Sequence, residues 1–144
     1  MLNNIFDENW SELKTLTGTA EHVPHAVLGL LSENEQEFDA SYWKLENHVV
    51  VQGELFDSAA VLPKYLEEVF IRSKFKHGVL ELLFQIGNGT CCDKELQNFC
   101  YREVIASLTR LKNHPEIVNT ELEGSINSEI NELVEINTQR NNQI

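Results

Sequence analysis

The sequence predicts an all-α protein of about seven helices that stack in pairs. Apolar residues recur at spacings of three and four residues along most of the 144-residue chain, which is typical of amphipathic helices. Segments of related character begin at Val23, Val61 and Val104, separated by 38 and 43 residues. Two-helix repeats of the HEAT and armadillo type have periods of about 40–47 residues. We therefore expect a short α-solenoid of this type, with a compact helical bundle as the alternative.

The N-terminal half is predicted to hold four helices. Proline is tolerated in the first turn of a helix, so Pro24 and Pro63 are compatible with the second and fourth of them. Expected N-caps are Asp7, the Ser32–Glu35 capping box and Asp57, and expected ends are Gly18 and Gly53. The apolar stripes are Phe6, Trp10 and Leu13; Val23, Val27, Leu30 and Leu31; Phe38, Tyr42, Leu45 and Val49; and Ala59, Leu62, Leu66, Val69 and Phe70.

The C-terminal half is predicted to hold three longer helices. Breaks are expected at residues 87–89 and at His114-Pro115, and Thr120–Glu123 reads as a second capping box. The Asn/Gln-rich residues 137–144 are expected to fray, within a single helical-repeat domain that spans residues 1–144. The stripes are Val79, Leu80, Leu83, Phe84 and Ile86; Leu96, Cys100, Val104, Leu108 and Leu111; and Leu122, Ile126, Ile130 and Leu133.

One short run resembles a β-strand. Val49-Val50-Val51 has the β-branched residues that strands favour. It is short and stands alone in a helical pattern, so the sequence predicts neither a sheet nor a hairpin here. Gln52-Gly53, which follows it, is instead expected to be a sharp corner between two antiparallel helices.

The charge balance limits the classes of partner. The formal net charge is −12, from 23 acidic and 11 basic residues. Direct binding to nucleic acid needs clusters of basic residues, so we expect none. A negative field accelerates the approach of a basic protein, although acidity also serves solubility alone. No Lys or Arg lies between Lys14 and Lys44 or between Lys112 and Arg140, where many acidic residues fall.

Other features indicate a cytoplasmic protein without a cofactor or a metal. No stretch approaches the roughly 18 consecutive apolar residues of a membrane span, and the N-terminus lacks a signal-peptide pattern. Three cysteines, two of them adjacent, make a poor disulfide framework. His22 and His25 are three residues apart, but no third ligand or catalytic partner is evident. We therefore expect no enzymatic activity.

The candidate partner-binding residues are acidic, with one aromatic. Glu35 and Asp57 also have expected tasks in helix caps, and Trp43 either packs against a neighbouring helix or lies on the binding face, where Trp is a common anchor. In a stacked helical protein, the loops and one layer of helices form a broad face, and we expect these acidic residues to lie on it. The predicted set is Glu33, Glu35, Glu37, Asp39, Trp43, Glu46, Glu54 and Asp57.

Residues 23–66 resemble a family of small bacterial HEAT-like proteins. The pattern comprises an opening proline, a Leu-Leu-Ser turn with an acidic residue, a Gln-Gly corner and an apolar residue before a second proline. The matching residues are Pro24, Leu30-Leu31-Ser32, Glu35, Ala40, Leu45, Asn47, Gln52-Gly53, Phe56, Ala59 and Val61-Leu62-Pro63. Members of this kind are similar to immunity proteins of polymorphic toxin systems, including contact-dependent growth inhibition.

The resemblance implies an immunity protein that neutralises a cognate bacterial toxin domain in the cytoplasm. We expect stoichiometric occlusion, with a monomer that binds its toxin 1:1, and no membrane association. The negative charge favours a basic toxin domain, such as a nuclease whose cationic groove the acidic face would occupy. The alternative is a HEAT-like adaptor or scaffold that binds an endogenous protein or peptide.

Overall fold

Helices make up 69% of the computed structural model, so the prediction of a mostly helical protein is confirmed. The structure describes residues 2–142. Three 3₁₀-helices, η1 to η3, accompany the α-helices in this part of the chain. The six α-helices described are α1 (Val23–Gly29), α2 (Glu35–Glu46), α3 (Leu62–Arg72), α4 (Lys76–Asn88), α5 (Lys94–Lys112) and α6 (Glu121–Asn141).

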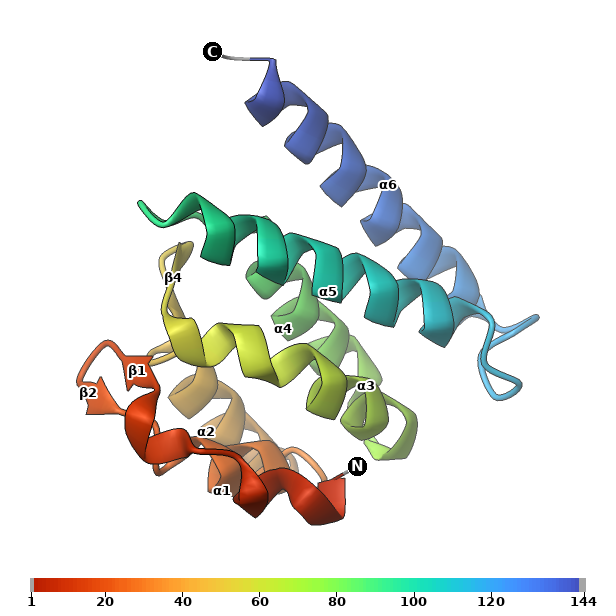
Figure 1. The fold of residues 1–144 in the computed structure, drawn as a ribbon. Coiled ribbons are helices and arrows are strands. Elements are labelled where there is room, and N and C mark those ends of the chain that lie inside the picture. The colour runs from red at the N-terminus through yellow and green to blue at the C-terminus, as the bar shows by residue number, and fades with distance from the viewer. Residues whose placement is uncertain (1, 143–144) are drawn as a thin grey trace.

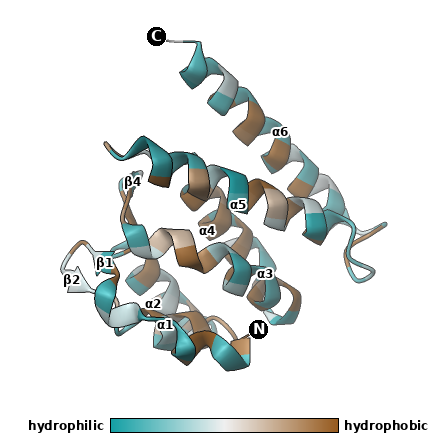
Figure 2. Ribbon diagram, in the orientation of Figure 1, coloured by the Kyte–Doolittle hydropathy of each residue, from teal (hydrophilic) through white to brown (hydrophobic). Residues whose placement is uncertain are grey.

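Consecutive helices pack as pairs, and the pairs pack on one another (Figure 1). Helix α1 packs on α2, α3 on α4, and α5 on α6. Helix α3 also contacts α1 and α5, whereas α4 contacts α2 and α6 and packs extensively on α5. The odd-numbered helices therefore form one layer, and the even-numbered helices form a second layer. Hydrophobic and hydrophilic residues alternate along each helix, as amphipathic packing requires (Figure 2).

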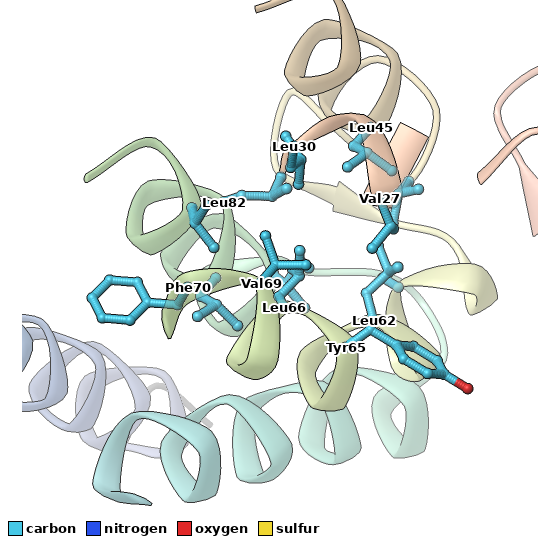
Figure 3. Close-up of a cluster of buried hydrophobic side chains, with 14 of the residues drawn as sticks. Val27, Leu30, Leu45, Leu62, Tyr65, Leu66, Val69, Phe70 and Leu82 are labelled. Carbon is cyan, nitrogen blue, oxygen red and sulfur yellow. The ribbon is translucent and has the colours of Figure 1, made fainter. Parts of the chain in front are cut away.

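The core is centred on α3. Figure 3 shows its side chains meeting those of α1, α2 and α4. All nine labelled side chains are at most 2% exposed, and they are Val27, Leu30, Leu45, Leu62, Tyr65, Leu66, Val69, Phe70 and Leu82. The apolar stripe predicted for this helix is confirmed, since Leu62, Leu66, Val69 and Phe70 are all buried. Pro24 and Pro63 lie in the first turns of α1 and α3, as predicted.

The N-terminal segment does not form the predicted α-helix. It folds as η1 (Leu2–Asp7), η2 (Trp10–Glu12) and a hairpin of β1 (Lys14–Thr15) with β2 (Gly18–Thr19). Phe6 is 54% exposed, whereas Ile5 and Trp10 are buried. Phe6 and Trp10 therefore do not share the buried helix face that their spacing predicted. The Trp10 indole donates a hydrogen bond to the Ile5 carbonyl (2.7 Å). This side-chain bond satisfies a carbonyl that a backbone amide would satisfy in an α-helix. Asp7 ends η1 and caps no α-helix.

The Gln52-Gly53 corner is a hairpin turn, so the prediction that it joins two helices is wrong. Strand β3 (Val50–Val51) pairs antiparallel with β4 (Glu54–Leu55), and α2 ends earlier, at Glu46. Gln52 and Gly53 both have positive φ, 51° and 82°. Two such residues between short strands form the tight turn that matches strand twist. The β-branched residues before the turn favour a strand over a final turn of helix.

Two of the predicted N-caps do not cap the helices to which they were assigned. Asn34, not Ser32, caps α2, and its side chain accepts a hydrogen bond from the Glu37 amide (3.0 Å). Asp57 opens η3 (Asp57–Val61), but its carboxylate accepts a hydrogen bond from the Lys14 amide and caps no helix. The side chains of Ser32 and Asp57 instead accept hydrogen bonds from backbone amides of loop and strand residues, Asn34 and Lys14.

The second predicted capping box is also absent. Thr120 precedes α6, but its hydroxyl donates to the Ile117 carbonyl (2.6 Å) and caps no amide. Residues 137–141 belong to α6, so fraying is not seen there, and residues 143–144 lie outside the described residues. Arg140 holds this end of α6, because its guanidinium donates to the Asn88 carbonyl (2.9 Å).

Candidate protein-interaction surface

The two helix layers differ sharply in charge. The even-numbered helices carry ten acidic and three basic residues, whereas the odd-numbered helices carry four acidic and six basic residues. Stacking therefore collects negative charge on one side, although the chain mixes both signs along its length. We call the ten acidic residues the acidic layer: Glu35, Glu37, Asp39, Glu46, Glu81, Glu121, Glu123, Glu129, Glu132 and Glu135.

Ion pairs occur in the odd-numbered layer, whereas none is found for the carboxylates of the even-numbered layer among the described residues. Arg110 makes a bidentate pair with Glu67, with N–O distances of 2.8–3.1 Å, and Arg72 lies 3.8 Å from Glu68. Among the described residues, no member of the acidic layer makes an ion pair. The Lys76 ammonium donates instead to three backbone carbonyls at the end of α3, at 2.7–3.0 Å. The charge of the acidic layer is therefore left for solvent or for a partner.

Polar side chains connect α2 to α4 within this layer. The Gln85 side-chain amide donates to the Tyr42 hydroxyl (2.8 Å) and to the Glu46 carboxylate (3.2 Å). Burial raises the pKa of Tyr42, and a hydrogen bond to Glu46 and the charges of Glu46 and Glu81 raise it further. Tyr42 therefore stays neutral and holds Glu46 at the junction of the two helices.

Glu129 continues the layer from α4 to α6. Burial raises its pKa to about 7, and the negative charges of Glu132 and Glu81 add to the shift. One of its carboxylate oxygens is buried without a hydrogen-bond partner among the described residues. Glu81 thus lies near enough to influence both Tyr42 on α2 and Glu129 on α6. A carboxylate cluster of this kind favours a cationic neighbour, which would relieve its repulsion.

Most of the sequence-predicted binding residues lie on α2 or in the loop before it. Glu33, Glu35 and Asp39 are exposed, and Glu37 accepts a hydrogen bond from the Ser32 hydroxyl (2.6 Å). Trp43 is 61% exposed, which is the outcome expected for a binding-face residue and not for a buried packing residue. Glu46 is half-buried beside Gln85 and Tyr42.

The other two predicted residues lie in the hairpin region. Glu54 is exposed in β4, and Asp57 is half-buried at the start of η3. The hydrogen bond from the Lys14 amide gives Asp57 a structural task in joining η3 to β1. The structure therefore does not bring Asp57 into the acidic layer.

Sequence reasoning missed Glu81, Gln85, Glu129 and Glu132 as parts of the surface. Each lies on α4 or α6, and only tertiary packing sets α4 against α2 and α6 against α4. The partial burial of Glu129 could have been predicted, because this residue directly precedes Ile130, a member of a predicted apolar stripe. An acidic residue at the edge of such a stripe is expected to be partly buried.

The histidine pair considered from the sequence is not assembled. His22 contacts His48, with ring centroids 4.7 Å apart, and His25 contacts Phe6 at 5.1 Å. No group of three potential metal ligands is found in residues 2–142. Cys100 is buried, as predicted for a small apolar residue, whereas Cys92 is exposed.

A hollow of about 590 Å³ lies on the odd-numbered layer between α3 and α5. Its charged lining residues include Lys64, Glu67 and Arg110, which are already engaged in ion pairs within the protein. This hollow therefore offers less unpaired charge to a partner than the acidic layer does. None of the helices in the described part of the chain has the length and apolarity needed to cross a membrane. Comparisons with protein-family models, curated proteins and solved structures give no match to this chain.

Proposed function

We propose that this protein is a bacterial immunity protein that binds a basic toxin domain through its acidic layer. The observation that carries the proposal is the excess of ten acidic over three basic residues on α2, α4 and α6, without ion pairs to the described residues. Binding is stoichiometric, 1:1, and takes place in the cytoplasm. The protein acts by occlusion and not as an enzyme.

The proposed scaffold is a short HEAT-like solenoid of three helix pairs. Contacts support it, because each odd-numbered helix contacts the next odd one and each even-numbered helix contacts the next even one. Repeat proteins of this type present broad surfaces built from one layer of helices. The shared first-turn proline of α1 and α3 agrees with a repeat that begins at Val23 and again near Val61.

Initial attraction of the toxin domain and tight binding of it use different parts of the surface. The acidic layer attracts a cationic domain over a range of about 10 Å at moderate salt, which accelerates encounter. The exposed ring of Trp43 then supplies apolar contact area of the kind that anchors interfaces. A nuclease is the preferred target, since its substrate groove must be cationic to bind phosphates, and the acidic layer would occupy that groove.

The test is co-expression with the toxin domain that this proposal expects to be encoded beside the gene. We expect the two proteins to co-purify as a 1:1 complex and the growth of toxin-expressing cells to be restored. A catalytically inactive toxin should still co-purify, because occlusion needs no turnover. Absence of both the complex and the rescue would refute the immunity function. The adaptor alternative predicts instead a stable complex with a housekeeping protein and no rescue.

A further inference from the structure

A pocket of about 470 Å³ lies where α2, the β3–β4 hairpin and α4 meet. Its volume falls within the range of about 300–1,000 Å³ typical of small-ligand sites. Helix α2 and the residue after it form one wall, the hairpin turn forms another, and α4 forms the floor. The lining residues are Glu46, Asn47, Val51, Gln52, Gly53, Phe84, Gln85 and Asn88.

The hairpin wall is held in place before any partner arrives. The Thr90 amide donates to the Gly53 carbonyl (2.7 Å), and the Leu55 amide donates to the Thr90 carbonyl (2.9 Å). These bonds attach the hairpin to the segment that follows α4. Gly89 permits the close approach, since a Cβ there would lie only 2.5 Å from the Leu55 side chain. The pocket is therefore a preformed feature of the fold.

The pocket is rich in hydrogen-bond acceptors and carries negative charge. Glu46 supplies a carboxylate whose position is fixed by the Gln85 side-chain amide (3.2 Å). Gln85 uses its Nε2 for both of its bonds, so its Oε1 accepts none from the described residues. The lining includes no Lys or Arg. Such a site suits a ligand that is cationic and only donates hydrogen bonds.

An arginine side chain has this chemistry. A guanidinium carries five N–H donors in a plane, and it stacks on aromatic rings more readily than an ammonium. Phe84 is half-buried and lines the pocket, so it supplies an aromatic ring for such stacking. At the edge of the pocket, the chain's own Arg140 already donates to the Asn88 carbonyl and to its side-chain oxygen, at 2.9 and 3.1 Å.

We propose that this pocket binds an arginine side chain presented by the partner protein. The inference deepens the proposed function and rests on it for the partner being a basic protein. The arginine would place its guanidinium against Glu46 and Gln85, with its plane over Phe84. The acidic layer would then provide long-range attraction, and the pocket would fix the register of the complex.

The test uses small probes and the full-length protein. N-acetyl-arginine N-methylamide is titrated at low ionic strength and followed by two-dimensional NMR. The citrulline analogue, which replaces the guanidinium by a neutral urea of the same shape, and the lysine analogue are titrated in parallel. We expect saturable shifts at the Gly53 and Asn88 amides and the Gln85 side chain with arginine only. Equal shifts with citrulline or lysine, or shifts spread over the surface, would overturn the proposal.

Variants locate the site. Glu46→Gln should weaken arginine binding about ten-fold, because the charge-assisted hydrogen bond is lost. Phe84→Leu should also weaken it while keeping an apolar floor. Glu12→Gln, at an exposed carboxylate of η2 outside the acidic layer, removes the same charge and should leave binding unchanged. Circular dichroism confirms that each variant is folded, and retained binding in folded Glu46→Gln would refute the assignment.

Failure of this inference is separable from failure of the proposed function. A toxin that co-purifies with folded Glu46→Gln as tightly as with the wild type would remove the pocket from the interface and leave the immunity function standing. Arginine-specific binding without any toxin complex would keep the pocket and refute the immunity function.

Discussion

Glu129 illustrates how one carboxyl group can set a pH dependence. Its pKa in the folded protein is raised from 4.5 to about 7 by burial and by nearby negative charge. Between these two values the folded state holds a proton that the unfolded state has lost. The contribution of Glu129 to the free energy of unfolding therefore falls as the pH rises from about 4.5 and is fully lost above about pH 7.

Replacing Glu129 tests this assignment. At pH 4.5, Glu129→Gln should be about as stable as the wild type. At pH 8 it should be more stable by about 1–2 kcal/mol. This value is smaller than the full pKa shift implies, because the carboxyl group is partly in contact with water. Glu132→Gln, which removes a neighbouring charge, should recover part of the gain. Urea unfolding across this pH range measures the difference, and a difference that stays constant with pH would contradict the assignment.

Leu45 tests the core at the residue scale. Its side chain is fully buried where α2 packs against α1, near Leu30 and Val27 (Figure 3). Leu45→Ala should lower the free energy of unfolding by about 2–5 kcal/mol, because the remaining side chains cannot fill the cavity. Val134, which is 43% exposed on α6, provides the matched control, and Val134→Ala should change stability by less than about 0.5 kcal/mol. A loss below about 1 kcal/mol for Leu45→Ala would show that this site is not tightly packed.

At the scale of elements, sequence patterns found helices well where packing follows periodicity. The stripe of α3 is an example, since its apolar residues at spacings of three and four are all buried. The patterns failed where the chain turns within a few residues. Between Val50 and Leu55 the chain forms a hairpin because both turn residues adopt positive φ. The sequence does not predict this turn well, because Gln is not one of the residues that favour positive φ. The acidic layer was only partly predictable, because tertiary packing sets α4, with Glu81, between α2 and the α6 helix that carries Glu129.

The β3–β4 turn yields an element-scale prediction with opposite signs at its two residues. Gln52→Asn should stabilise the protein by about 0.5–1 kcal/mol, because Asn adopts the left-handed conformation with less strain. Gly53→Ala should destabilise it by about 1 kcal/mol, because a Cβ is unfavourable at a φ of 82°. Thermal and urea unfolding measure both variants. Equal effects of both substitutions would show that the turn does not hold this conformation.

At the scale of the whole molecule, the fold converts a mixed sequence into two sides of different charge. In the odd-numbered layer, three of the six basic residues form ion pairs with carboxylates, and these are Lys64, Arg72 and Arg110. The even-numbered layer has ten carboxylates without such pairs among the described residues. Net charge alone would attract a basic partner to any side, whereas this separation gives the attraction a direction.

Charge removal at matched positions tests that direction. The triple variant Glu81→Gln, Glu132→Gln and Glu135→Gln neutralises exposed residues of the acidic layer, and a control triple at Glu12, Glu95 and Glu116 removes the same charge elsewhere. At low salt the layer variant should bind the toxin domain about ten-fold more slowly than the wild type, because electrostatic steering is weakened. The control should slow binding by less than about two-fold, and both differences should shrink at high salt, where charges are screened. Stopped-flow association rates across ionic strengths provide the measurement, and equal slowing by the two triples would mean that total charge, not the acidic layer, guides the partner.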